Sequence, residues 1–293
     1  MKRRFATFVG VDLGGARGKT TAVAQLAATP HGHAAVRSIS TRHQGAPWVD
    51  ETLLGYLESL AGDDVVIAIG APLTGPACSR CVLPACPGVA DCVDPAVVWL
   101  RTAGRELTED AELADTVAAG QTTTALHGHS HPRVRIQPYA HRATELVVCY
   151  ERGLLPASAI GHATGQVAAR AAHLRRRLLR AGFALHQNLI EVSPPATIAA
   201  LFDRRRARGY KRDADPWQTR AMMVESLGDL EFAPVSRMAR EDALRNDHCF
   251  EALIAAYTAY LWARDGWQMP EPSPFTEDGW IWTPPPPAHK RSR

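Results

Sequence analysis

Short apolar stretches separated by turn residues fill the first 70 residues, and their order limits the folds that the chain can adopt. Phe5 to Asp12 (FATFVGVD), Thr20 to Leu26 and Ala35 to Ser40 each have the composition of a β-strand. The connections between them are short and contain glycine or proline, so we expect three consecutive antiparallel strands. The fold is therefore predicted to begin with an antiparallel meander.

A helix and a buried strand follow the meander. Leucines recur at helical spacing between Asp50 and Leu60, which predicts a helix with Asp50 as its N-cap. Val65 to Ile69 (VVIAI) is short, continuous and β-branched, as in a central parallel strand that is covered on both faces. These patterns predict a mixed α/β sheet, with three antiparallel strands and then parallel strands, flanked by helices.

Regular patterns return after residue 160. They predict a strand at Leu189 to Val192 and helices at His162 to Ala181, Ala196 to Arg206, Met222 to Leu227 and Asp247 to Arg264. Glu145 to Tyr150 fits either a strand or the start of a helix. We therefore expect one α/β domain from residues 1–71 and 161–283, an insertion at 72–160, and a Pro-rich, basic, disordered tail at 284–293.

The predicted insertion carries the most specific local motif in the chain, which is a cluster of four cysteines. Cys78, Cys81, Cys86 and Cys92 lie within fifteen residues (CSRCVLPACPGVADC). Four thiolates so close together predict a metal site. Only the first spacing is CxxC, which favours an iron–sulfur cluster, with Zn²⁺ as the alternative. Unligated thiols or disulfides are a third interpretation.

Four acids are candidates for chemistry at the edge of the sheet. Asp12 ends the first buried strand, Glu191 lies in a short apolar strand, and Asp247 and Glu251 share one face of a helix. Carboxylates gathered in this way can hold metal ions that activate water for phosphodiester cleavage. Simpler interpretations also exist: Asp12 can shape a turn, Asp247 can cap a helix, and Glu251 can be a solvated helix residue.

Several segments together resemble one known family. They are VGVDLGG around Asp12, IEVSPPATIAAL from Ile190, DHCFEALIAAYTAYL from Asp247 and EDGWIWTP from Glu277. These segments are similar to the family catalogued as domain of unknown function 429, which is regarded as predicted nucleases of the RNase H-like superfamily. The resemblance implies an RNase H-like sheet and phosphodiester chemistry dependent on Mg²⁺ or Mn²⁺, with Asp12, Glu191, Asp247 and Glu251 as the site residues. The chain departs from the family at Gly70, where an acid is usual.

A glycine-rich turn follows Asp12. The turn resembles a P-loop in its residues, which are Gly14, Gly15, Arg17 and Lys19. A P-loop needs a glycine five residues before Gly18, and that position is a leucine, so the P-loop spacing is not met. A nucleotide-binding hairpin of the actin-like kind, with backbone amides and the two cations facing phosphate, is one interpretation. A plain hairpin turn is the other.

Basic segments suggest an anionic partner. Arg175 to Arg180 lie on one predicted helix, and Arg204 to Arg212 on another, with Tyr210 available to stack on a base. We expect nucleic acid or nucleotide as the partner, although a solvated helix face explains the same pattern. The alternating His127, His129 and His131 fit either a metal site or an exposed loop. No apolar run is long enough to span a membrane, so a cytoplasmic protein is expected.

Three hypotheses remain open from the sequence. The first is a metal-dependent nuclease, the second a redox or sensory iron–sulfur protein on a catalytically silent scaffold, and the third an actin-like nucleotide-binding phosphotransferase.

Overall fold

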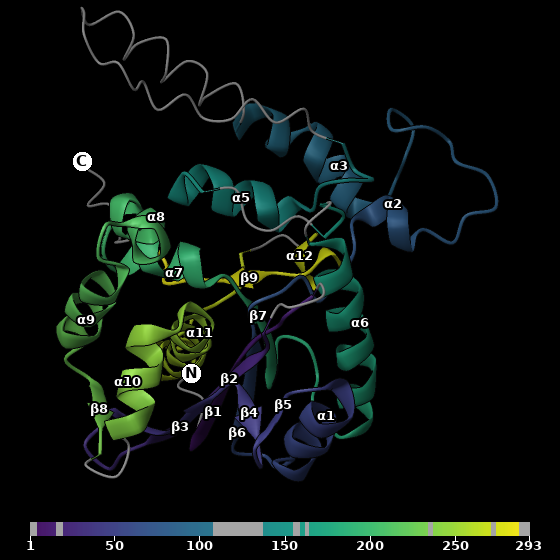
Figure 1. Cartoon of the computed structure of the whole chain (residues 1–293). Coiled ribbons are helices and arrows are strands. Elements are labelled where there is room, and N and C mark those ends of the chain that lie inside the picture. The colour runs from purple at the N-terminus through teal and green to yellow at the C-terminus, as the bar shows by residue number, and fades with distance from the viewer. Residues whose placement is uncertain are drawn as a thin grey trace, which may run out of the picture.

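A seven-stranded sheet forms the centre of the molecule in the computed structural model (Figure 1), with the strand order β8-β3-β2-β1-β6-β7-β9. The structure describes residues 5–15, 20–107, 137–154, 159–161, 164–233, 237–270 and 274–286. The strands are β1 (Thr7–Asp12), β2 (Ala22–Ala28), β3 (Ala34–Ser40), β6 (Val65–Ile69), β7 (Leu189–Val192), β8 (Leu230–Phe232) and β9 (Ile281–Trp282).

The sheet is mixed, as predicted. β1, β2 and β3 pair antiparallel in chain order. On the other side of β1, strands β6, β7 and β9 follow in parallel, and β8 adds a parallel strand next to β3. Because β1, β6 and β7 run in the same direction, their carboxyl ends meet at one edge of the sheet, where ligands collect in open α/β sheets.

Helices cover both faces. α11 (Asp247–Asp265) lies along β1, β2 and β6 on one face, and nearly all of its residues are buried. α1 (Asp50–Ser59) and α6 (Gly165–Arg180) cover the other face. Alternate residues of β1 serve the two cores: Phe8 packs on the α11 side, and Val9 and Val11 pack on the α1 side.

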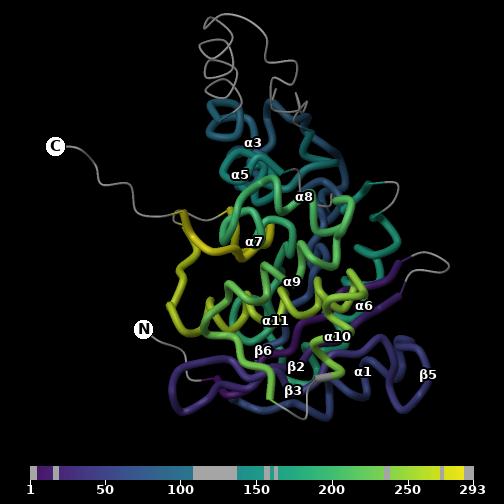
Figure 2. Tube along the Cα trace, turned by 60° about the vertical axis from the view of Figure 1, so that its left-hand side comes forward, coloured from purple at the N-terminus to yellow at the C-terminus, as the bar shows by residue number. Residues whose placement is uncertain are grey.

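The remaining elements surround this centre. They are β4 (Arg42–His43), β5 (Ala46–Pro47), α2 (Ala77–Arg80), α3 (Pro95–Arg101), α5 (Ala143–Arg152), α7 (Pro194–Leu201), α8 (Arg204–Arg212), α9 (Pro216–Ser226), α10 (Arg237–Arg245) and α12 (Phe275–Asp278). Figures 1 and 2 agree that α3 and α5 lie together at one end of the molecule, opposite β3 and β5. The segment from Glu145 to Tyr150, which fits either a strand or a helix by sequence, lies in the helix α5. Among the described residues, no helix has the length and apolar character needed to cross a bilayer.

Several predicted helix boundaries differ from the structure; the helix expected from Met222, for example, is α9 and begins at Pro216. The helix expected from Ala196 to Arg206 ends at Leu201, and a new helix starts after Asp203, whose carboxylate accepts the Arg206 N–H at 2.7 Å. The predicted N-cap of the first helix is also wrong: Asp50 is the first residue of α1, and Val49 stands at the N-cap position. α11 begins at Asp247, as predicted, and the Asn246 side chain caps it by accepting the His248 and Cys249 N–H groups.

Candidate metal site at the carboxyl edge of the sheet

A cavity of about 430 Å³ opens where β1, β6 and β7 end. Its wall is formed by the ends of these strands, the first turns of α7 and α11, and Lys211 of α8. Gly70, at the position where an acid was expected from the resemblance, lines the cavity directly after β6. The cavity is therefore at the edge predicted from the order of the strands.

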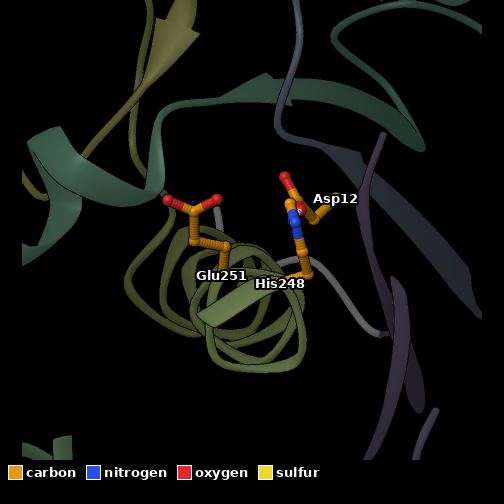
Figure 3. Close-up of side chains that lie close together, drawn as sticks. All are labelled: Asp12, His248 and Glu251. Carbon is orange, nitrogen blue, oxygen red and sulfur yellow. Dashed lines mark hydrogen bonds and ion pairs between the residues drawn. The ribbon is translucent and has the colours of Figure 1, made fainter. Parts of the chain in front are cut away.

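Three side chains converge on one side of this cavity. Asp12 reaches from the end of β1 toward His248 and Glu251 in the first turns of α11 (Figure 3), and Asp12 Oδ2 lies 2.6 Å from His248 Nδ1. One possible ligand atom from each residue lies within 4.8 Å of the other two, close enough to surround one cation. Asp12 and Glu251 are each only 8% exposed, so both carboxylates are largely removed from water.

The sequence around the start of α11 explains this convergence. Asn246 Oδ1 accepts the His248 N–H at 2.9 Å, which fixes the first turn at the sheet edge. His248 and Glu251 are three residues apart and share a helix face. Gly10 brings α11 close to β1, because a Cβ at this position would lie 2.1 Å from the Ala252 carbonyl oxygen.

Glu251 stands at the centre of the local charge network. Burial, followed by the nearby Asp12 carboxylate, raises its pKa. Its Oε1 lies 2.7 Å from Lys211 Nζ and also accepts the Tyr210 hydroxyl. Although burial lowers the pKa of Lys211, its ion pair with Glu251 raises that pKa above the usual value. Lys211 also lies 3.5 Å from Asp247 Oδ2.

His248 is held in the orientation set by Asp12. The hydrogen bond to Asp12 raises the pKa of His248 from 6.5, against the opposing effect of burial. Two buried carboxylates and an imidazole therefore share a small space, with Lys211 as the neighbouring cation.

Glu191 lines the same cavity but is held by other groups. Both of its oxygens accept from the buried Arg142 guanidinium, at 2.6 and 2.8 Å, and Oε2 also accepts the Leu73 N–H at 2.8 Å. Burial lowers the pKa of Arg142, but its contacts with Glu191 and Glu145 outweigh burial and raise that pKa. This is the arrangement of a buried bidentate ion pair.

The structure brings together some of the predicted acids and not others. Asp12 and Glu251 join the group of possible ligands, whereas Asp247 and Glu191 are outside it. The metal-binding roles predicted for Asp247 and Glu191 remain predictions. His248 was not predicted; its spacing of three residues from Glu251 is the signal that points to it. Arg142 and Lys211 were also not predicted as parts of the site.

The glycine turn after β1 is only partly described. The Gly14 N–H donates to Thr21 Oγ1 at 3.1 Å, and a Cβ on Gly15 would lie 2.2 Å from the Val167 side chain. Arg17 and Lys19 lie outside the described residues, so their predicted contact with phosphate remains a prediction.

The four clustered cysteines all lie in the described part of the chain. Each thiol is free; Cys78, Cys81 and Cys86 are exposed and Cys92 is half-buried. Within the described ranges, their sulfurs do not form a closed group of possible metal ligands. Burial raises the pKa of the Cys78 thiol, and so do the other three cysteines, which lie within electrostatic reach. The structure thus shows an open loop of four thiols, and the predicted iron–sulfur or zinc site remains a prediction.

The two basic segments differ in their relation to the cavity. α8 borders it through Lys211, and its Arg204, Arg205 and Arg208 are exposed. α6 lies well away from α8 in Figure 1, and its Arg175 donates to the Leu73 carbonyl oxygen. Tyr210 is 2% exposed, so its predicted stacking on a base is wrong. The histidines at 127, 129 and 131 lie outside the described residues.

Comparison with known families places most of the chain in one family model. A family model described as a protein of unknown function (DUF429) matches residues 10–274. No curated protein and no solved structure is detectably similar to the chain.

Proposed function

The chain belongs to the DUF429 family, whose function is unknown, and we propose that it is a divalent-metal-dependent phosphodiester hydrolase with an RNase H-like fold. The observation that carries this proposal is the convergence of Asp12, His248 and Glu251 beside the cavity. Three possible ligands from two elements far apart in the sequence meet at the sheet edge where active sites collect.

The donor set fits a divalent cation. Two buried carboxylates repel one another, as the raised pKa of Glu251 reflects after the effect of burial, and a cation between them would relieve that repulsion. Carboxylate ligands suit Mg²⁺ and Mn²⁺, and the imidazole of His248 favours Mn²⁺ over Mg²⁺. Such an ion would polarise a phosphoryl oxygen and lower the pKa of a bound water.

The surrounding residues supply binding and orientation. Lys211 can exchange part of its contact with Glu251 for an anionic phosphate in the cavity, because its ammonium is already at the wall. The exposed arginines of α8 continue from Lys211 along the same helix and offer a track for a nucleic-acid backbone. In this proposal, Glu191 anchors the cavity wall through Arg142.

The test is nucleolytic cleavage with Mn²⁺ and with Mg²⁺, comparing Asp12→Asn with the unaltered chain. We expect cleavage to require the metal and to be abolished by Asp12→Asn. The matched control is Asp63→Asn, which makes the same Asp-to-Asn change at an exposed position away from the cavity. This control variant should keep full activity. Cleavage by Asp12→Asn at the level of the control would contradict the proposal.

A second candidate function rests on the four free thiols. A redox or sensory protein carrying an iron–sulfur cluster would need these cysteines and would not need Asp12. Iron and sulfide in anaerobically purified protein, with no metal-dependent cleavage, would favour it over the hydrolase.

A further inference from the structure

The loop between α2 and α3 has no hydrophobic core of its own. Residues 81–91 are exposed and form no helix or strand. Directly after it, Cys92 packs against a small buried cluster that consists of Ala77, Ala96 and Val97. A segment that buries so little apolar surface needs another source of stability, such as a disulfide or a metal.

Polar contacts already shape the loop around its thiols. The Gly88 N–H donates to Cys86 Sγ at 3.4 Å, in a turn where Gly88 has a φ of +91°. Such N–H···S bonds are part of the outer shell of metal-bound thiolates. From the other side, the Arg101 guanidinium donates to the carbonyl oxygens of Val89 and Cys92, at 2.8 and 3.2 Å. These contacts fold the loop back onto α3, with Cys81, Cys86 and Cys92 within electrostatic reach of Cys78.

We propose that Cys78, Cys81, Cys86 and Cys92 bind one Zn²⁺ ion as a structural site, and that this ion holds Arg80 in the ion network behind the cavity. Binding replaces the four thiol protons, which are released to solvent, and involves no change of oxidation state. The zinc site itself does not depend on the proposed hydrolase activity; only its effect on the cavity concerns that site.

Exposure is the reason to assign zinc instead of a cluster. The cysteine spacing alone favours iron–sulfur, but three of the four thiols are exposed and the residues between them are exposed as well, with Val82 at 93%. Zn²⁺ has no redox chemistry and forms closed four-cysteine sites in exposed loops. A cluster at this place would be open to water, and solvent exposure strongly affects its potential.

Arg80 connects the loop to the buried network. It lies between Cys78 and Cys81 and donates to Asp278 Oδ1 at 3.0 Å. The other oxygen of Asp278 accepts the Ala143 N–H at 2.6 Å. Asp278 is fully buried, and burial raises its pKa in spite of these donors. Arg80 is thus the side chain that ties the cysteine loop to a buried acid.

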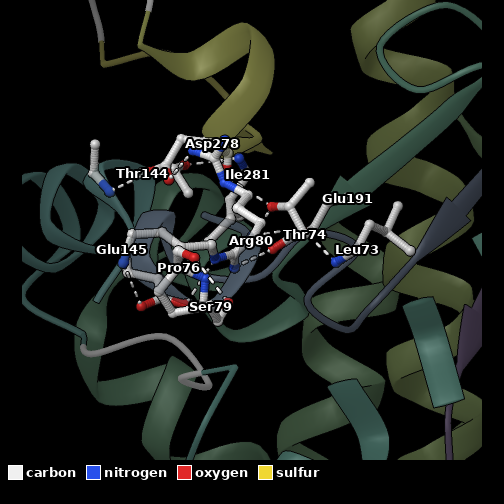
Figure 4. Close-up of polar contacts among 12 residues, drawn as sticks. Leu73, Thr74, Pro76, Ser79, Arg80, Thr144, Glu145, Glu191, Asp278 and Ile281 are labelled. Carbon is white, nitrogen blue, oxygen red and sulfur yellow. Dashed lines mark hydrogen bonds and ion pairs between the residues drawn. The ribbon is translucent and has the colours of Figure 1, made fainter. Parts of the chain in front are cut away.

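The network continues to the cavity. Thr74 Oγ1 donates to the Asp278 carbonyl oxygen at 2.6 Å and accepts from Arg142 at 2.8 Å. Arg142 in turn donates to Glu191. Glu191 also accepts the Leu73 N–H (Figure 4). Each step is a direct hydrogen bond, so fixing the CxxC turn would restrict the wall that carries Glu191.

Metal analysis tests the zinc site. We expect one zinc and no sulfide per chain in protein purified without added metal, and no visible absorption. Cys81→Ser with Cys86→Ser should lose the zinc, whereas Val82→Ser, an exposed change in the same loop, should retain it. Stoichiometric iron with sulfide would overturn the assignment in favour of a cluster. A folded, zinc-free chain that takes up no added Zn²⁺ would also overturn it.

Hydrogen exchange tests the link to the cavity, independently of any hydrolysis. We expect chelation of the zinc to reduce protection of the Ala143 and Leu73 amides by roughly tenfold or more, because each donates to a buried carboxylate. Arg80→Met in zinc-loaded protein should do the same. The Gly70 amide, which donates to the Val11 carbonyl oxygen, is the internal control. Unchanged protection of Ala143 and Leu73 in both samples would overturn the link.

Discussion

The close packing of α11 on β1 predicts a large effect for Gly10→Ala. The new methyl group would lie 2.1 Å from the Ala252 carbonyl oxygen, 2.3 Å from the Ala256 nitrogen and 2.9 Å from the Ala256 Cβ. Two of these atoms belong to the helix backbone, so no side-chain rotation relieves the overlap. Restoring ordinary contact requires α11 to move away from the sheet by roughly 1 Å or more, in a core that is already close-packed.

The expected cost follows from that displacement. Overpacking a core usually costs about 1–3 kcal/mol, and we expect Gly10→Ala to reach at least about 3 kcal/mol because the overlap is with backbone atoms. The same movement separates His248 and Glu251 from Asp12. A misplacement of about 1 Å can reduce a rate by roughly 100-fold, so activity should fall more than stability alone explains.

The assay is denaturant unfolding of Gly10→Ala beside a matched control. Gly55→Ala is the control, because Gly55 is an exposed residue of α1 whose added Cβ would meet nothing within 4 Å. This change should stabilise the fold by about 0.5–1 kcal/mol through helix propensity. The two alanines should therefore act in opposite directions. A Gly10→Ala midpoint equal to or above that of the unaltered chain would refute the packing argument.

Two further predictions concern the charges. Arg142→Met should destabilise the fold by about 3–5 kcal/mol in denaturant unfolding, because it leaves the buried Glu191 and Glu145 without their partner. The control is Arg206→Met, which breaks an exposed ion pair and should cost at most about 1 kcal/mol. Equal losses of stability in the two variants would contradict this account. NMR titration of metal-free protein should give His248 a pKa above 6.5, returning toward 6.5 in Asp12→Asn. The pKa of His248 is higher in the folded than in the unfolded chain, so protonated His248 stabilises the fold fully below about pH 6.5. That stabilisation is lost as the pH rises through the folded pKa. A folded pKa below 6.5 would contradict the contact with Asp12.

The sheet could be predicted because its signals are local. Strand composition, short glycine-containing connections and the run VVIAI predict three antiparallel strands followed by parallel strands. The short strands β8 and β9 were not predicted. The break between α7 and α8 was missed because it depends on one side chain, Asp203, which caps a new helix where apolar periodicity alone continues the old one.

The site was only half predictable for a different reason. Asp12 and Glu251 have positional signals, at a strand end and on a helix face. The partners of an acid are set by tertiary contacts: nothing local in the sequence shows that Glu191 meets Arg142, 49 residues away. For the same reason Tyr210 looked available for stacking, although its hydroxyl is turned inward to Glu251.

The central claim is that Asp12, His248 and Glu251 together hold one divalent cation. The most direct measurement is an anomalous difference map from a crystal soaked in Mn²⁺. It should show a peak at about 2.0–2.6 Å from an oxygen of Asp12, a nitrogen of His248 and an oxygen of Glu251. The claim would be contradicted if the map showed no peak there at saturating Mn²⁺ and Asp12 remained hydrogen-bonded to His248.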